Sequence, residues 1–505
     1  MIHLHSNSKV AALADFLSLF AGRVGGILVT LFFIPQYNRL LGADVFGAIA
    51  VVLSLQSFFL MSDLGLATLI SRDAAVARND PVALSAVAWM RRRAEAVLTL
   101  LAIGLSALAI LPPLAGLPVP WSIGSGVNAA MIALLIMTLV ATNIVQLSLN
   151  ALGMYRAGAG ISVAGALARG IATILVLRAA PSLLAFLQAQ LVMAALHFAA
   201  ARWVLERRCA PSMEGERLLD RLAMAQLLRR CLPLMLYTLG GAAAVNLDKS
   251  IISAFISLEV AGAYFLATTY ALVPVGILSG PINSYFAPRV AHARHAGDAA
   301  SEYRLALTFQ LVLMCTVVGP SLSLAFQMSD WLMLWLHDAG QVTRIMAVAP
   351  ILLAGGALSA TGYYPTTYLI AAEDNSYLAR LSMIATAGVL VAAPLFASRL
   401  DLAGVAWSYL AFYAVGFAGL WLRFGSKIGW RALGEFLAIT YLVPAIVIAL
   451  SYLPLYAFVH TTAVSAPVML LVPVAVASGL GLLATAAIFL RARNRSGWTE
   501  HKELP

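Results

Sequence analysis

A run of 25 residues without a single charge, GVNAAMIALLIMTLVATNIVQLSLN (126–150), decides the fold class. An α-helix of this length is about 37 Å long, which exceeds the roughly 30 Å hydrocarbon core of a bilayer. The polar residues Asn143, Gln146 and Asn150 follow the spacing i, i+3, i+7, so they share one face of such a helix. The stretch therefore predicts a membrane-spanning helix with one amide-bearing face.

The rest of the chain has the same character. Apolar residues make up 62% of its 505 positions, charged residues only 11%, and the mean hydropathy is +0.90. A soluble domain carries about 25% charged residues, so lipid must be the solvent of this chain. Thirteen further stretches are apolar enough to span: 11–36, 44–70, 94–112, 157–178, 182–203, 232–256, 260–282, 304–328, 346–371, 377–397, 402–422, 435–457 and 466–490. We predict an all-α integral membrane protein with about 14 transmembrane helices, and a re-entrant turn is possible over 329–345.

The basic residues predict the orientation of these helices. With the N-terminus inside, 25 of the 32 Lys and Arg residues fall in cytoplasmic segments, four fall outside and three lie within spans. Such a bias is the usual signature of cytoplasmic loops. Both termini are therefore expected in the cytoplasm, and the net charge of +10 reflects these loops rather than a nucleic-acid partner.

An internal repeat divides the chain. A shift of 215 places Gly25-Gly26 on Gly240-Gly241, Asp44-Val45 on Glu259-Val260, and Gly47-Ala48 on Gly262-Ala263. Both copies start inside, which predicts two parallel six-helix repeats with a substrate site at their interface. We expect a six-helix lobe over 1–203, a cytoplasmic linker over 204–231, a second six-helix lobe over 232–425, and two extra C-terminal helices with a cytoplasmic tail over 426–505. The linker is either a short interfacial helix or a solvated loop.

Charged residues inside predicted spans are the first candidates for function, because each costs roughly 2.5–3.5 kcal/mol to insert. The cations are Arg23, Arg169 and Lys249, which we assign to substrate binding in a central cavity. The carboxylates Asp63 and Asp248 are assigned to ion coupling. A purely structural pairing of Arg23 with Asp63, or of Asp248 with Lys249, is the alternative.

Uncharged polar residues support a hydrated cavity in the first half. Asn143, Gln146 and Asn150 share a helix face, Gln56 shares one with Asp63, and Gln190 shares one with His197. Each residue alone is better explained by hydrogen bonding between helices, which contributes about 0.6–2 kcal/mol per pair. Polar faces on several helices of one lobe together favour a lumen.

Several classes of site are missing from the sequence. None of the four lysines follows a glycine, which excludes a P-loop, and no HExxH sequence occurs. The three cysteines, Cys209, Cys231 and Cys315, have no metal-ligand spacing and are interpreted as small apolar residues. We expect no catalytic residues, no metal and no cofactor beyond a possible H⁺ or Na⁺ for coupling.

Two stretches carry a family resemblance. YNRLLGADVFGAIAVVLSLQSFFLMSDLGLATLISRDAA (37–75) resembles the start of bacterial polysaccharide flippases of the Wzx type, in the multidrug/oligosaccharidyl-lipid/polysaccharide (MOP) exporter superfamily. NLDKSIISAFISLEVAGAYFLATTYALVPVGILSGPINSYFAPRVA (246–291) looks like its counterpart in the second half. Length, span number and the six-plus-six repeat agree with this resemblance.

The resemblance implies a function in surface polysaccharide biosynthesis, such as that of O-antigen. The substrate would be an undecaprenyl-pyrophosphate-linked oligosaccharide, moved from the cytoplasmic to the periplasmic leaflet of the bacterial inner membrane by alternating access. A polymerase and a chain-length regulator of the same pathway are possible partners, besides membrane lipids. Arg23 matches a position where these flippases tend to carry an arginine. A multidrug exporter of the same superfamily and a membrane polymerase or glycosyltransferase stay open as alternatives.

Overall fold

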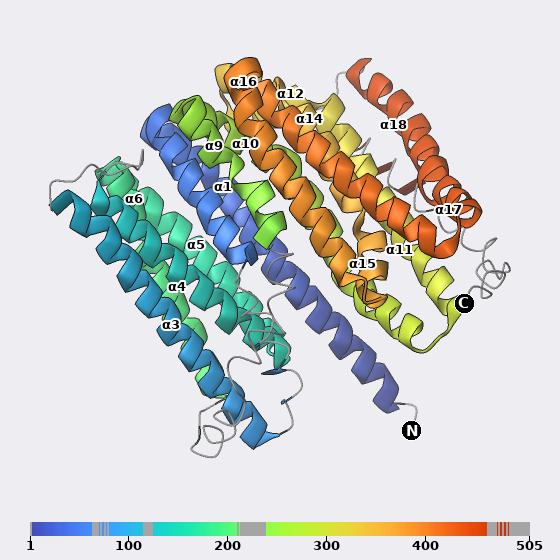
Figure 1. Ribbon diagram of the computed structural model, residues 1–505, viewed down its shortest axis with the longest axis horizontal. Coiled ribbons are helices and arrows are strands. Elements are labelled where there is room, and N and C mark those ends of the chain that lie inside the picture. The colour runs from blue at the N-terminus through green and yellow to red at the C-terminus, as the bar shows by residue number, and fades with distance from the viewer. Residues whose placement is uncertain are drawn as a thin grey trace. The chain divides into compact units, whose positions relative to one another are not determined.

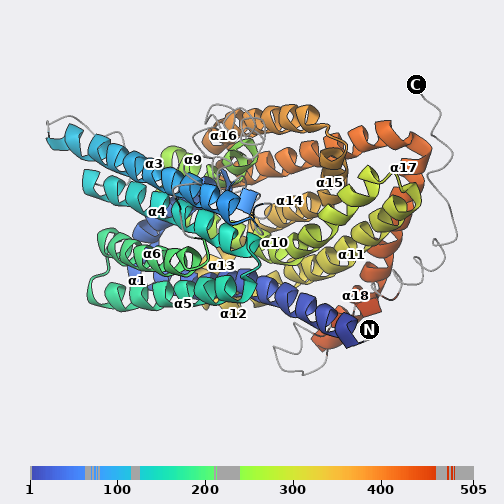
Figure 2. The same cartoon turned by 90° about the horizontal axis from the view of Figure 1, so that it is seen from below.

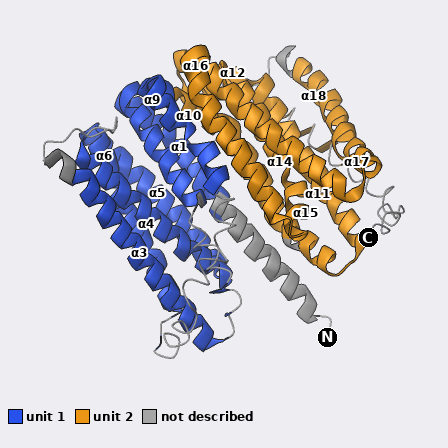
Figure 3. Cartoon of the chain, viewed as in Figure 1, with its two compact units in different colours: residues 1–262 blue, residues 263–505 orange. Residues whose placement is uncertain are grey.

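The computed structural model describes residues 3–62, 80–114, 125–209 and 239–461, together with a few isolated positions between and after them. The side chains of 3–21 and of Arg23 lie outside the described part. The described chain divides into two compact units, unit 1 (Met1–Gly262) and unit 2 (Ala263–Pro505), coloured separately in Figure 3. Unit 1 thus extends past the predicted lobe 1–203 and takes in the first helix of the second repeat.

The first helix, α1 (His3–Ser62), contains two of the predicted spans. At 60 residues it is about 90 Å long if straight, three times the thickness of the hydrocarbon core. Gly42 divides it, with φ 75° and ψ 170°, a backbone conformation that favours glycine. The break falls between the predicted spans 11–36 and 44–70.

Four long helices complete most of unit 1. They are α3 (Pro81–Leu114), α4 (Gly126–Ala151), α5 (Tyr155–Ala179) and α6 (Leu183–Glu206), which run side by side in Figures 1 and 2. The helix α3 begins 13 residues before the predicted span 94–112. Asp80 caps this early start by accepting hydrogen bonds from the N–H groups of Val82 and Ala83.

Glycines let α1 approach α5 closely. A Cβ atom on Gly22 would lie 2.6 Å from the Cβ of Ala159, and one on Gly25 would lie 3.0 Å from Val163. On α5 itself, a Cβ on Gly170 would lie 2.2 Å from the ring of Phe33. Small residues at such positions allow helix backbones to pack at short distance in membranes. The glycines around Arg23 are thereby explained by packing, without a ligand.

The internal repeat has a structural counterpart within unit 1. The chain continues through α9 (Asp248–Phe255) into α10 (Leu258–His295). A Cβ on Gly262 would lie 3.2 Å from the Cα of Gly47, and a Cβ on Gly47 would lie 1.9 Å from the carbonyl oxygen of Leu258. The two glycines that the 215-residue shift aligns therefore meet at one helix crossing.

Unit 2 holds the remainder of α10 and the later helices. These are α11 (Ala299–Phe326), α12 (Met328–Leu336), α13 (Ala339–Met346), α14 (Ala349–Thr361), α15 (Tyr363–Ala371), α16 (Asn375–Ile428), α17 (Trp430–Leu437), the π-helix η3 (Ala438–Leu442) and α18 (Val443–Thr461). Asp401, with φ 56° and ψ −145°, divides the 54-residue α16 between the predicted spans 377–397 and 402–422. The region 329–345 forms the short helices α12 and most of α13.

A break between α14 and α15 exposes one backbone carbonyl. Pro365 has no N–H to donate to the oxygen of Thr361, four residues earlier. Gln310 Nε2 of α11 donates to this oxygen at 3.0 Å, and the Tyr441 hydroxyl of η3 donates to it at 2.5 Å. Two side chains from distant segments thus replace the lost helical hydrogen bond.

The all-α membrane fold is confirmed. Within the described residues, nine helices are long and apolar enough to cross a membrane, or ten if the bent pair Ala339–Met346 and Ala349–Ala371 forms one span. Counting α1 and α16 as two spans each matches twelve of the fourteen predicted spans. Of the other two, 232–256 is described only in part and 466–490 falls almost wholly outside the described residues.

Candidate functional site

Arg169 on α5 is a cation within a predicted span, and no described carboxylate neutralises it. It is partly buried and interacts electrostatically with Tyr37 of α1 and His197 of α6. No ion pair between described residues includes it. A guanidinium is always charged, so this position keeps a positive charge within the membrane-spanning part of the chain.

Polar and aromatic groups surround Arg169. Gln190 Nε2 of α6 donates a hydrogen bond of 3.0 Å to the hydroxyl of Thr173, one turn along α5. The Tyr37 hydroxyl interacts with both of these residues. The Tyr37 ring lies between Phe33, with stacked rings 6.3 Å apart, and Phe186, with edge-on rings 5.5 Å apart. The aromatic rings therefore fix the Tyr37 hydroxyl beside the cation.

His197 adds an open hydrogen-bonding position to this group. Its ring packs on α5, where a Cβ on Gly165 would lie 2.7 Å from Nδ1. Its Nε2 atom is buried and finds no hydrogen-bond partner among the described residues. We name Tyr37, Arg169, Thr173, Gln190 and His197 the Arg169 cluster. It combines a permanent cation with neutral donors and acceptors, which suits an anion that carries hydroxyl groups.

The face of α4 that carries Gln146 and Asn150 also packs against α5. A Cβ on Gly158 of α5 would lie 2.7 Å from Gln146 Nε2 and 2.9 Å from Asn150 Oδ1. Gln146 Oε1 is buried without a hydrogen-bond partner in the described part of the chain, and Asn143 is partly buried. On the second half of α1, Gln56 is buried and its Nε2 is likewise unpartnered among described residues. Several amide groups of unit 1 thus retain hydrogen-bonding capacity.

The side chains of two other predicted site residues lie outside the described part of the chain. Asp63 lies outside the described residues, and for Arg23 only the backbone, within α1, is described. Their assignments to coupling and to substrate binding stay predictions, as does the alternative that they pair with each other.

Asp248 and Lys249 lie against one another at the start of α9. The Lys249 ammonium is 2.8 Å from the Asp248 carboxylate, and both side chains are buried. This arrangement is the structural pairing that the sequence left as an alternative. Lys249 and Asp248 therefore act as one neutral pair in this conformation rather than as two separate charges.

Sequence reasoning missed a second set of charges at one end of unit 1. Arg91 and Glu95 of α3 form a buried ion pair, Arg202 of α6 lies 3.1 Å from Glu95, and Glu206 lies 3.1 Å from Arg92. The available signal was the spacing i, i+4 of Arg91 with Glu95 and of Arg202 with Glu206. Glu95, and also Asp15 in α1, lie inside predicted spans, so Asp63 and Asp248 are not the sole carboxylates there.

The family model described as "Polysaccharide biosynthesis protein" matches residues 38–339, more than half of the chain. The chain belongs to this family. No curated protein matches the sequence at a significant level. Among the described residues no group of three His, Cys, Asp or Glu side chains could hold a metal ion.

Solved structures show the fold of this family member. The lipid II flippase MurJ, in an inward closed conformation, matches with a TM-score of 0.64 at 11% identity over 96% of this chain and 100% of that one. A MATE transporter in complex with MaL6 matches with a TM-score of 0.58 at 14% identity over 84% and 97%. A MOP superfamily transporter from Pyrococcus furiosus, whose pocket of reverse polarity suggests a different function, matches with a TM-score of 0.59 at 13% identity over 84% and 96%. The chain has the fold of MOP superfamily transporters and is a multi-pass membrane protein.

Proposed function

We propose that this protein is a flippase for undecaprenyl-pyrophosphate-linked oligosaccharide repeat units, of the Wzx type. It carries these units from the cytoplasmic to the periplasmic leaflet of the bacterial inner membrane, by alternating access, for the assembly of a surface polysaccharide such as O-antigen. Both termini lie in the cytoplasm, and a polymerase and a chain-length regulator act on the delivered units.

The Arg169 cluster is the observation that carries this proposal. A pyrophosphate needs a cation that is not already neutralised, and Arg169 meets that requirement among the described residues. Its planar guanidinium can donate two parallel hydrogen bonds to phosphate oxygens. Gln56, Gln146 and His197 each have a side-chain atom without a partner among the described residues, and such atoms can bind sugar hydroxyls. Arg23 and Lys249 complete the proposed set of cations. In this conformation Lys249 forms an ion pair with Asp248 and binds the substrate only after that pair separates.

The charge of the cluster separates this function from its main alternative. A MATE-like exporter of cationic drugs needs an unpaired carboxylate where the drug's charge sits. The fully buried carboxylates of the described chain, Glu95 and Asp248, each have a cationic partner. A membrane polymerase or glycosyltransferase, the alternative from another class, needs catalytic acids or bases. The Arg169 cluster offers His197 but no described carboxylate to act with it.

Transport is coupled to an H⁺ or Na⁺ gradient in this proposal, with Asp63 and Asp248 as the carboxylates involved. A cation that binds Asp248 must compete with the ammonium of Lys249, 2.8 Å away. Binding would then release Lys249 from its carboxylate. Carboxylates in membrane spans are well suited to such exchange because one bound ion neutralises them.

The proposal is tested in cells that lack their own flippase gene and produce surface polysaccharide only when this protein works. Arg169→Gln should abolish most of the polysaccharide, whereas Arg169→Lys should keep part of it, because the charge remains and the paired hydrogen bonds are lost. Arg178→Gln is the control, since it removes an exposed arginine from the same helix. Full polysaccharide with Arg169→Gln, at equal protein level in the membrane, would contradict the proposal.

A further inference from the structure

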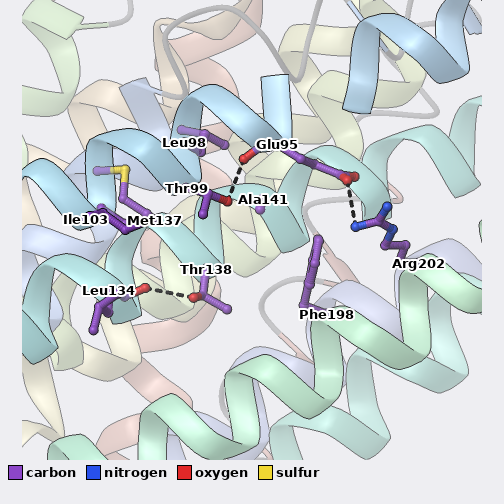
Figure 4. A pocket seen from close by; sticks show the side chains of 11 residues that line it. Glu95, Leu98, Thr99, Ile103, Leu134, Met137, Thr138, Ala141, Phe198 and Arg202 are labelled. Carbon is purple, nitrogen blue, oxygen red and sulfur yellow. Dashed lines mark hydrogen bonds and ion pairs between the residues drawn. The ribbon is translucent and has the colours of Figure 1, made fainter. Parts of the chain in front are cut away.

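A pocket of about 160 Å³ lies among α3, α4 and α6, and no residue of the Arg169 cluster lines it (Figure 4). Glu95 and Arg202 line its charged side, and most of the remainder is apolar, with Leu98, Ile103, Met137 and Phe198 among its residues. Two threonines, Thr99 and Thr138, also line it, and their hydroxyls donate to backbone carbonyls of their own helices. An engineered apolar cavity of about 150 Å³ holds one benzene-sized group. This pocket therefore has room for a short length of hydrocarbon. We call it the α3–α6 pocket.

Exposed apolar residues beside the pocket indicate that this side of unit 1 meets lipid. Its lining residue Ile103 is 57% exposed, and its neighbours on α3, Leu100 and Leu108, are 69% and 67% exposed. On α6, Leu196 is 58% exposed. An exposed apolar stripe on membrane-spanning helices is the part that meets acyl chains. A chain can thus enter the pocket sideways from the bilayer.

The polar side of the pocket carries surplus positive charge. Three arginines, Arg91, Arg92 and Arg202, share two carboxylates, Glu95 and Glu206, in one network of ion pairs. The Nε atoms of Arg91 and Arg92 are buried and find no acceptor among the described residues. Among the described residues the network therefore has a net charge of +1 and donors without a partner, to which an anionic oxygen could bind.

Further cations and aromatic rings surround this end of the helices. Arg207 and Arg208 follow α6 and are exposed, and the Arg207 guanidinium lies 3.5 Å from the centre of the Trp203 ring. Trp203 is 57% exposed, and Trp89 donates a hydrogen bond from its indole to the Ser212 carbonyl at 2.8 Å. Tryptophans at such positions mark the level of the lipid headgroups.

We propose that the α3–α6 pocket binds an anionic glycerophospholipid of the leaflet in which it lies. The phosphate contacts Arg92 and Arg202, and one acyl chain enters the pocket between Leu98 and Phe198. The site differs from the transport site, because the pocket is too small for an oligosaccharide and its charges are not those of the Arg169 cluster. The bound lipid completes the ion network and stabilises the packing of α3 on α6.

The test compares lipids with equal acyl chains on the purified protein, with bound lipids counted by native mass spectrometry. Phosphatidylglycerol should bind more tightly than phosphatidylcholine. Arg202→Gln should weaken phosphatidylglycerol binding about fivefold, the effect expected for one basic residue near the headgroup. Ala141→Leu, which fills the pocket and leaves every charge in place, should weaken it as well. The control Arg178→Gln, an exposed arginine at the other end of this helix bundle, should leave it unchanged.

Three results would overturn the inference. The first is equal affinity for the two lipids, and the second is the same loss with Arg178→Gln as with Arg202→Gln. The third is displacement of phosphatidylglycerol by millimolar glycerol phosphate, because the headgroup alone would then suffice. None of these results depends on whether the protein flips lipid-linked oligosaccharides, so this inference and the proposed function stand or fall separately.

Discussion

The two units differ in what they bury. Each charged side chain that is fully buried among the described residues belongs to unit 1: Arg91, Glu95, Asp248 and Lys249. In the described part of unit 2 the buried centre is aromatic instead, with Tyr364, Phe424, Phe436 and Trp421 in mutual contact at centroid distances of 5.4–6.0 Å for their closest pairs. Buried charges are costly and are retained at sites of function or switching, whereas aromatic clusters stabilise packing.

This difference assigns separate roles to the units. Unit 1 holds the described charges that the proposed substrate requires. Unit 2 has a broken helix. The Thr361 carbonyl at the break accepts hydrogen bonds from the side chains of Gln310 and Tyr441. Because Tyr441 of η3 lies in the predicted span 435–457, the first of the two extra C-terminal helices fixes this break. A supporting role for that helix follows, in addition to any contact with lipid.

Gly47→Leu should have the largest effect on unit 1. A Cβ at this position would lie 1.9 Å from the Leu258 carbonyl oxygen, so α1 and α10 would have to separate. We expect a loss of at least about 3 kcal/mol in the free energy of unfolding, the upper range for overpacking. Thermal denaturation in detergent measures this. Gly104→Ala, where nothing lies within 4 Å, serves as the control, and equal stability of both variants would contradict the close crossing.

Glu95→Gln should be the next largest effect. It removes the more deeply buried of the two carboxylates that Arg91 and Arg202 share and leaves them only Glu206. Removing one partner from a buried ion pair costs about 3–5 kcal/mol. Glu435→Gln removes the carboxylate from an exposed pair with Arg431 in unit 2 and should cost less than about 1 kcal/mol. Denaturation curves of the two variants compare a buried pair with an exposed one. Similar curves would mean that water screens the ion pairs of Glu95 with Arg91 and Arg202 as strongly as it screens a pair on the surface.

Unit 2 is tested at the broken helix. Tyr441→Phe removes one of the two donors to the Thr361 carbonyl and should cost about 1 kcal/mol. Gln310→Leu removes the other donor and should cost a similar amount. The double variant should lose more than the sum, because only then is the carbonyl left without a partner. Strict additivity in unfolding measurements would show that the two side chains do not share this role.

The smallest effect concerns pH and one ion pair of unit 2. The Arg423 guanidinium, 2.8 Å from Asp374, holds the pKa of that carboxyl below its usual value of 3.8. A depressed pKa contributes stability above the unfolded value, and this is lost as the pH falls through the folded value. The melting temperature should therefore fall more steeply below pH 4 in the wild type than in Asp374→Asn. Parallel curves for the two proteins would remove the pair from the acid response.

Much of the fold was predictable because lipid imposes simple rules. The uncharged run 126–150 became α4 with nearly the predicted ends, and Gly42 and Asp401 break the long helices between predicted spans. The start of α3 was misplaced because Arg91, Arg92 and Arg93 suggested a loop, although glutamates on α3 and α6 compensate two of the three charges. A hydropathy profile treats every charged residue as costly, whether or not the fold pairs it with an opposite charge.

The candidate site was predictable only in part. Arg169 stood out as a charge inside a span, but Tyr37 and Thr173 carry no such signal because their roles depend on which helices meet. The donation of Tyr441 to Thr361, 80 residues away, depends in the same way on tertiary packing. A single sequence identifies charged residues inside membrane spans more readily than it identifies the residues that contact them in the fold.

The central claim is that Arg169, whose charge no described carboxylate neutralises, binds the phosphates of the transported lipid. The direct measurement is the affinity of the purified protein for undecaprenyl pyrophosphate, compared with undecaprenol, which has the same hydrocarbon and no charge. The account predicts that the wild type prefers the pyrophosphate and that Arg169→Gln weakens this binding at least about tenfold, the loss of one charge-assisted pair, without changing the affinity for undecaprenol. Equal affinity of the wild type and Arg169→Gln for undecaprenyl pyrophosphate would contradict it.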